Sequence, residues 1–360
     1  MQHGGWNRGT LGVLLVHSLL LQVVTYCLRP SLSYAALEAG LGSEWLGVLS
    51  AAFALPGLGL AIPAGRLADR IGERALGVAG GALMLGAAVT ALLGHQSIVA
   101  ILVATTAFGL GHLITVVCDQ ALLANRTEPA RRDTVFGAYA FSVSLGQGVG
   151  GALLAVNAGI AATPDLRLQF VLSVVITALG LFAAVLLRSS PRHAPSERPR
   201  TVPVRNMLRE PAVLRAVLAS SVVVTAVEIT LIYFPALGYE LGYPAAVVSA
   251  MLVARAAAGM LSRVGLGAVI RVVGRRRLMV GSIAVSAVAL TAVALPLGPV
   301  WTVGVCAMFG LLNGFCQPLT LSWLSEIAPS GQRGTLMSVR LASVRISQTA
   351  VPGGIGALGG

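Results

Sequence analysis

The chain has 360 residues and a formal net charge of +12; 56% of its residues are hydrophobic and only 11% are charged. Its mean hydropathy of +0.84 is too high for a soluble domain. Apolar runs of about 20 residues, each long enough to cross a hydrocarbon core roughly 30 Å thick, recur along the chain. A segment in lipid must satisfy its own backbone hydrogen bonds, and these runs lack strand-like alternation. We therefore predict an all-α, polytopic membrane protein embedded in a lipid bilayer.

Eleven helices are predicted in chain order. They cover residues 10–36, 44–65, 75–94, 98–121, 134–157, 167–187, 212–238, 245–268, 277–296, 300–325 and 334–358. Between the sixth and the seventh, residues 188–211 are rich in Pro and Arg and have no apolar face, so they are expected to form a linker without a core of its own. The linker divides the chain into an N-terminal six-helix bundle, 1–187, and a C-terminal bundle of five helices, 212–360.

The arginines at the ends of these helices and between them indicate the orientation. With a cytoplasmic N-terminus, 19 arginines lie on the inside, the linker included, and only Arg167 lies outside. Because positive residues are retained in the cytoplasm, we expect a multi-pass protein of the cell membrane with its N-terminus in the cytoplasm. The same confinement of arginines to short loops argues against nucleic acid as a partner.

The sequence offers little for metal, cofactor or enzyme chemistry. The four cysteines lie inside apolar runs, and no CxxC or Cys/His ligand spacing is present, so we expect neither a metal site nor a disulfide. The glycine-rich stretches 57–65 and 146–153 fall inside predicted helices, where glycine permits close helix packing, so we expect no phosphate-binding loop and no cofactor. No DDxxD-type carboxylate pair is present, which argues against a membrane transferase and against an enzyme in general.

A weak internal repeat relates the two halves. Arg132 and Gln147 recur as Arg333 and Gln348, at an offset of 201 residues. Gly65 and Gly72 recur at an offset of 202, and Pro30 recurs at an offset of 205. Repeats of this kind are typical of transporters, which bind substrate near the bilayer midplane between the halves.

Two stretches resemble the major facilitator superfamily. GRLADRIGERAL, 65–76, resembles the family's G-x-L-x-D-R-x-G-R-R loop signature, and residues 128–154 resemble its loop 4–5 and fifth helix. The resemblance implies two six-helix pseudo-repeats and secondary transport by alternating access. Gln147 stands where the family's antiporter signature has proline, and Thr105 stands where its fourth helix has arginine. The family has twelve helices, so we expect a truncated product or a fragment that lacks the twelfth.

The charged loop is interpreted as a conformational latch made of Gly65, Asp69, Arg70 and Gly72. The glycines permit a tight turn, and Asp69 is placed to meet the positive N-terminal end of a neighbouring helix. The resemblance identifies that neighbour as the helix that begins near Gly334, and it implies that the contact closes the cytoplasmic side.

Ionisable residues inside the helices are the candidates for binding and coupling, because a charge in lipid usually faces a cavity or a partner. Glu228 is the one carboxylate at the midplane. It forms a buried ion pair with Arg255 or with an arginine of helix 334–358, or it takes up and releases protons during transport. The candidates for substrate binding and coupling are Arg29, Glu228, Arg255, Arg340, Arg345, Tyr26, Gln147, Gln317 and Gln348.

Other buried groups are interpreted as structural. Arg263 is expected to snorkel to the cytoplasmic interface, and Asp119 is expected to pair with Arg126 there. His17 and His112 are expected to be packed and neutral. Arg340 and Arg345 lie about 140° apart on a helix, so they are not expected to face one cavity equally.

The predicted function is secondary active transport of a small organic molecule, coupled to protons, by a protein that acts as a monomer. The glycine run in helix 134–157 favours efflux of a drug or metabolite. Proton-coupled uptake by a symporter and an inactive, truncated remnant are the alternatives.

Overall fold

The computed structural model describes residues 8–42, 44–127, 132–156, 161–189, 204–295, 298–327 and 333–359, and the secondary structure of this part is entirely helical. Its helices are α1 (Arg8–Glu38), α2 (Glu44–Ile71), α3 (Glu73–Gly94), α4 (Ile98–Arg126), α5 (Arg132–Leu153), α6 (Leu166–Leu186), α7 (Val204–Arg209), α8 (Pro211–Glu240), α9 (Ala245–Val273), α10 (Arg275–Ala292), α11 (Pro299–Ile327) and α12 (Arg333–Gly359). All eleven predicted helices are present; α7 is an additional helix of six residues.

Not all of the long helices are equally apolar. Seven of the described helices are long and apolar enough to cross a membrane: α1, α3, α4, α6, α8, α9 and α11. By this criterion of length and composition, seven of the eleven predicted helices are membrane-spanning. The other four, α2, α5, α10 and α12, also have 18 or more residues. Charged residues, together with glycine and serine, interrupt their apolar stretches, as in the Arg-Arg-Arg start of α10.

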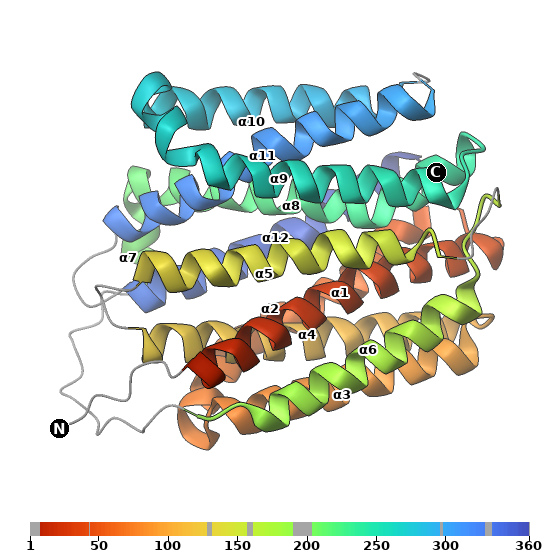
Figure 1. Ribbon diagram of the computed structural model, residues 1–360, viewed down its shortest axis with the longest axis horizontal. Helices are drawn as coiled ribbons and strands as arrows, with labels where there is room; N and C mark the ends of the chain where they lie inside the picture. Colours follow the sequence, from red (N-terminus) through yellow and green to blue (C-terminus); the bar gives the residue numbers. More distant parts are fainter. Residues whose placement is uncertain are drawn as a thin grey trace.

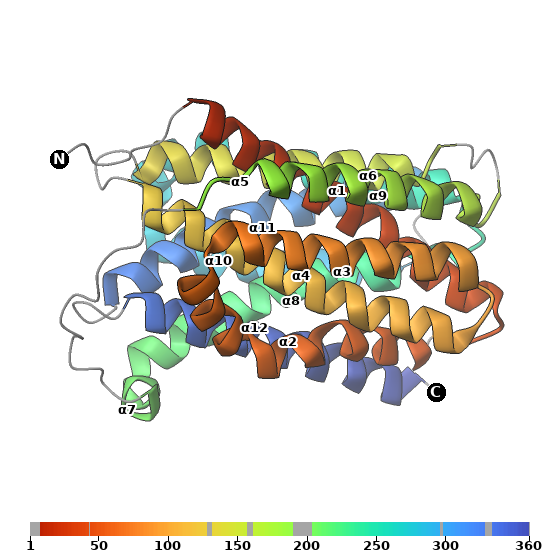
Figure 2. The same cartoon turned by 90° about the horizontal axis from the view of Figure 1, so that it is seen from below.

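The long helices run side by side along the longest axis of the molecule in two groups (Figure 1). In the first, α1 packs on α5 and α6, and α4 packs on α2 and α3. In the second, α11 packs on α8, α9 and α10, and α8 packs on α12. The groups meet where α1 contacts α8, α2 contacts α12 and α5 contacts α9. Figure 2 shows α2 and α12 together along one side of the bundle.

Tight turns with glycine in a left-handed conformation connect equivalent helices in the two groups. Gly72 between α2 and α3 has φ +89°, and Gly274 between α9 and α10 has φ +84°. A residue with a side chain rarely adopts such a φ, so both turns depend on glycine. These are two of the positions that the internal repeat relates.

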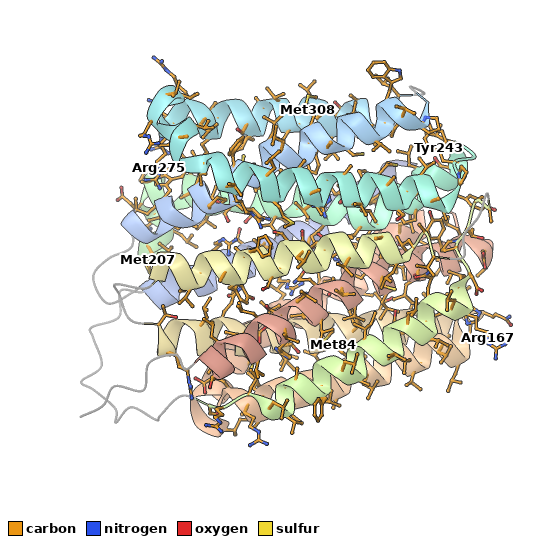
Figure 3. The ribbon with its side chains drawn as sticks, in the orientation of Figure 1. Met84, Arg167, Met207, Tyr243, Arg275 and Met308 are labelled. Carbon is orange, nitrogen blue, oxygen red and sulfur yellow. The ribbon has the colours of Figure 1, made fainter. Side chains whose placement is uncertain are left out.

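The predicted linker is more structured than its sequence indicated. Its C-terminal part forms α7, and Met207, 4% exposed, packs with Val213 of α8, Leu324 of α11 and Leu336 of α12. One buried methionine therefore anchors α7 at the end of the second group, on residues that other helices provide. In Figure 3, Met207 and Arg275 lie at one end of the bundle, and Arg167 and Tyr243 lie at the other.

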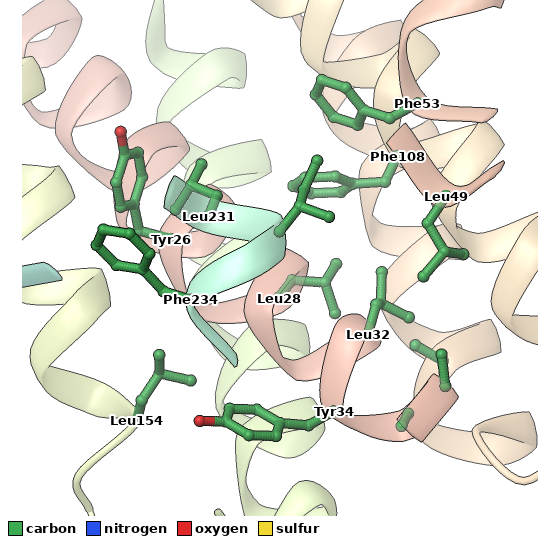
Figure 4. Packing of buried hydrophobic residues seen from close by; sticks show 14 of the residues in the cluster. Tyr26, Leu28, Leu32, Tyr34, Leu49, Phe53, Phe108, Leu154, Leu231 and Phe234 are labelled. Carbon is green, nitrogen blue, oxygen red and sulfur yellow. The ribbon is translucent and has the colours of Figure 1, made fainter. Parts of the chain in front are cut away.

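Apolar side chains fill the interior and also cover the outside. The core around the two groups' contact includes Tyr26 and Leu28 of α1, Phe53 of α2, Phe108 of α4 and Leu231 of α8 (Figure 4). On the outside, large apolar side chains are 81–87% exposed at Leu93, Val264, Val272 and Val300. This distribution suits helices whose outer faces contact lipid rather than water.

Glycine brings helices into close contact at two places. In α5, Gly146 and Gly150 lie so near the carbonyls of Leu19 and Val23 in α1 that a Cβ would collide with them. In α11, Gly310 packs in the same way on the carbonyl of Arg255 in α9. These contacts hold the helices that carry the polar residues described below.

Candidate substrate and coupling site

Glu228 and Arg29 form an ion pair that joins the two groups of helices. Glu228 lies on α8, and its carboxylate accepts a hydrogen bond from the Arg29 guanidinium, which α1 positions just before Pro30. The Arg29 side chain is 5% exposed and that of Glu228 is 17% exposed. The expected partners of Glu228 were Arg255 or an arginine of the last helix. The structure instead pairs it with Arg29, which is 199 residues away in sequence.

Phe53 of α2 lies beside this ion pair and was not predicted as a site residue. The Arg29 guanidinium carbon is 3.9 Å from the centroid of the Phe53 ring, and that of Arg345 is 5.4 Å from it. The ring face attracts cations electrostatically, so one aromatic side chain supports two arginines from different groups of helices. The imidazole of His112 is centred 5.5 Å from the same ring. An aromatic residue in an apolar run gave no signal of this role.

Arg345 is held by neutral groups. It donates a hydrogen bond of 3.1 Å to the side-chain oxygen of Gln348, and the Ser50 hydroxyl of α2 donates one of 2.9 Å to the backbone carbonyl of Gln348. Arg345 is 7% exposed. Three predicted residues, Arg29, Arg345 and Gln348, therefore lie at the contact between α1, α2 and α12.

Tyr26 and Arg255 form the next part of the site. The Arg255 guanidinium carbon lies 5.2 Å from the centroid of the Tyr26 ring, and Arg255 is 5% exposed and Tyr26 2% exposed. Neither Nε nor Nη2 of Arg255 has a hydrogen-bond partner among the described residues. A charged donor that is buried without a partner is expensive, so these two atoms point to a group that the protein itself does not provide.

A small cavity lies beside Arg255 between α5, α8, α9 and α11. The polar side chains that line it are Ser144, Gln147, Arg255, Arg263, Asn313 and Gln317. Three of these, Gln147, Arg255 and Gln317, are predicted site residues. Ser144 was missed because small polar residues are common in helix bundles, and Arg263 was missed because it was placed at the interface.

The interpretation of Arg263 as a snorkelling residue was wrong. Its guanidinium turns inward and donates hydrogen bonds to the Ala140 carbonyl at 3.1 Å, to the Ser144 hydroxyl and to the Gln317 side-chain oxygen at 2.9 Å. It thus bridges α5 and α11 across the cavity. The close approach of α9 to α11 at Gly310 brings these groups within its reach.

Arg340 stays apart from this cluster. Its Nε donates to the Ser220 hydroxyl of α8 at 2.5 Å, and it does not line the cavity. This agrees with the expectation that Arg340 and Arg345 face different directions on their helix.

A second buried polar pair lies between α1 and α4. Nδ1 of His17 is 2.7 Å from Oδ1 of Asp119, and the side chains are 3% and 0% exposed. The prediction treated His17 as a packed, isolated residue and Asp119 as an interfacial partner of Arg126. Helix packing instead brings together two residues 102 positions apart.

The predicted latch lies mostly outside the described side chains. Gly65, Asp69 and Arg70 belong to the last turns of α2, but nothing is described of the Asp69 and Arg70 side chains. Gly72 forms the turn described above, and the Ser189 hydroxyl accepts a hydrogen bond of 3.1 Å from the neighbouring Arg74 N–H. The latch therefore stays a prediction. In the described residues that were searched, His, Cys, Asp and Glu form no cluster of three or more that could hold a metal.

Comparison with known proteins identifies the family. The sequence profile of the Major Facilitator Superfamily matches residues 14–352. No match was found among curated proteins. The fold is similar to that of a mutant of the nucleoside transporter NupG, with a TM-score of 0.78 and 12% identity over 97% of this chain and 91% of that one. It is also similar to a POT family transporter in complex with 5-aminolevulinic acid, with a TM-score of 0.77 and 16% identity over 99% and 92% of the two chains. A third similar structure is a D-xylose-proton symporter, with a TM-score of 0.75 and 16% identity over 96% and 89%. This chain is a multi-pass membrane transporter and belongs to the Major Facilitator Superfamily.

Proposed function

We propose that this chain moves a small organic molecule by alternating access and couples that movement to protons through Glu228. The observation that carries the proposal is the Arg29–Glu228 ion pair, since it joins α1 to α8 across the two groups of helices. Two opposite charges attract strongly where water is scarce. Protonation of Glu228 removes one charge and weakens the link, so proton binding and the separation of the groups are coupled.

The surroundings of the pair support this role. Glu228 is 17% exposed, which leaves a route for a proton, whereas Arg29 is almost fully buried and rests on Phe53. One of the similar structures is a D-xylose-proton symporter, so a protein with a similar fold couples transport to protons. This supports the proposal.

The direction of transport is part of the same proposal. The glycine pattern of α5 favours export, and proton-coupled uptake is the alternative. In the structure Gly146 and Gly150 pack α5 on α1, a contact that either direction would use. The arginine distribution supports insertion in the cell membrane with a cytoplasmic N-terminus, and the latch at Asp69 would then act on the cytoplasmic side.

Proton flux in proteoliposomes tests the coupling. The purified full chain is reconstituted with a pH-sensitive dye inside the vesicles, and a panel of organic acids, sugars and nucleosides is added outside. At least one compound should drive a pH change in vesicles with the wild-type chain. Glu228→Gln should abolish the pH change but retain exchange of the same compound labelled on one side.

Glu240→Gln is the matched control, because Glu240 lies on the same helix and is exposed. It should behave like the wild type. Proton flux that persists unchanged in Glu228→Gln would overturn the coupling role. The absence of both flux and exchange for every compound would overturn the transport proposal for this chain.

A further inference from the structure

We propose that the substrate is a small organic carboxylate, and that Arg255 binds its carboxylate group in the cavity between α5, α8, α9 and α11. The inference rests on the proposed transport function and names the substrate class for it. Three observations support it: the charge of the cavity, the unpartnered edge of Arg255 and the hydrogen bonds that Arg263 already makes.

The cavity is cationic. Arg255 and Arg263 both line it, and no carboxylate is among the described residues that line it. Arginine is not deprotonated in proteins, so both charges persist in the buried site. Glu228 is paired with Arg29. The two cavity arginines therefore have no carboxylate partner among the described residues. An anionic ligand is the chemistry that such a space favours.

Arg255 offers a preformed binding edge. The two atoms without a partner, Nε and Nη2, lie on the same side of the planar guanidinium, where their N–H bonds run parallel. Such a fork matches the two oxygens of a carboxylate and forms two parallel charge-assisted hydrogen bonds. The side chain is only 5% exposed, so a bound anion would be shielded from water.

Neighbouring residues hold that edge in place. The Tyr26 ring lies 5.2 Å from the guanidinium carbon. The backbone of Arg255 is fixed against Gly310, where any side chain would collide with the Arg255 carbonyl oxygen. Preorganisation of this kind lowers the entropy lost on binding.

Arg263 differs from Arg255, and this difference favours a carboxylate over a phosphate. Arg263 already donates to Ala140, Ser144 and Gln317, so three of its five N–H groups are engaged within the protein. One open fork satisfies the two oxygens of a carboxylate and leaves the further oxygens of a phosphate unsatisfied.

Calorimetric titration of the full purified chain in detergent micelles tests the assignment. The probes are benzoate, butyrate and succinate, and the controls are benzamide, butyramide and inorganic phosphate. At least one carboxylate should bind, whereas its amide should not. Arg255→Lys keeps the charge but lacks the fork, so it should weaken binding about tenfold or more. Arg340→Lys, outside the cavity, should bind like the wild type.

Thermal unfolding of the wild-type chain keeps the test independent of how well the variant folds. The carboxylate that binds should raise the unfolding temperature of the wild-type chain, whereas its amide should leave that temperature unchanged. Equal binding by the wild type and a folded Arg255→Lys, binding of phosphate alone, no binding by any carboxylate, or equal stabilisation by the carboxylate and its amide would each overturn the inference.

The two proposals can fail separately. Glu228→Gln should retain carboxylate binding, because Glu228 does not line the cavity. Carboxylate binding without proton-coupled transport would overturn the proposed function alone. Proton-coupled transport of uncharged compounds, with no carboxylate binding, would overturn the Arg255 site alone.

Discussion

Replacement of Arg29 by glutamine should destabilise the fold by about 3 kcal/mol. Arg29→Gln leaves Glu228 in place with 17% exposure and without its ion-pair partner. Removal of one member of a buried pair typically costs about 3–5 kcal/mol, because the remaining charge is uncompensated. The partial exposure of Glu228 lets water reach the carboxylate, so we expect the lower end of that range.

Replacement of Glu228 should cost less. In Glu228→Gln the Arg29 guanidinium still lies 3.9 Å from the Phe53 centroid, and a desolvated cation–π contact contributes about 2 kcal/mol. We expect a loss of about 1–2 kcal/mol. The double variant leaves no charge at either position, so its loss should be smaller than the sum of the single losses by about 2 kcal/mol.

Equilibrium unfolding in mixed micelles, followed by circular dichroism, measures these differences. Arg340→Gln combined with Glu228→Gln is the control pair, because Arg340 donates to Ser220 and makes no ion pair with Glu228. The control losses should add within about 0.5 kcal/mol. Additive losses for Arg29→Gln and Glu228→Gln would refute the argument that the pair links α1 to α8.

Three further predictions follow from other contacts. Gly310→Ala should destabilise the chain by about 1–3 kcal/mol, because the new methyl group meets the Arg255 carbonyl. Gly304→Ala in the same helix is the control, because its methyl group meets nothing within 4 Å. Equal unfolding free energies for the two variants would contradict this prediction. His17→Leu leaves the Asp119 carboxylate, which is 0% exposed, without its partner and should lower the free energy of unfolding by about 3–5 kcal/mol. Adding Asp119→Leu should restore part of this stability; no recovery would show that the pair is not the cause. Asp69→Asn should shift the transporter toward its inward-open state and raise the labelling of cysteines introduced on the cytoplasmic side. Unchanged labelling would remove the latch from the mechanism.

The positions of the helices could be predicted from composition. Apolar runs of sufficient length must be helical in lipid, because only a helix satisfies its backbone hydrogen bonds within one segment. All eleven predicted helices are present, and seven of the described helices are long and apolar enough to cross a membrane. The glycines at 72 and 274 could also be predicted, since a turn with positive φ excludes most other residues.

The candidate site was predicted only as a set of residue types. A charge inside an apolar helix is costly, so Arg29, Glu228, Arg255 and Arg345 were evident from the sequence alone. Their partners were not. Glu228 was assigned to Arg255 or to the last helix, and Arg263 was assigned to the interface, because spacing along one helix says nothing about which neighbour it faces.

The sequence by itself determined that the chain lies in a lipid bilayer, where its helices lie and that some charges are buried. Each of these follows from the hydropathy of a single segment. Only the tertiary structure decided the pairs Arg29–Glu228 and His17–Asp119, the support from Phe53 and the open edge of Arg255. The two pairs join residues that are 199 and 102 positions apart in the chain, so they depend on how distant helices pack together. Close contacts at Gly146, Gly150 and Gly310 set that packing, and a small rotation of any helix would change which side chains meet.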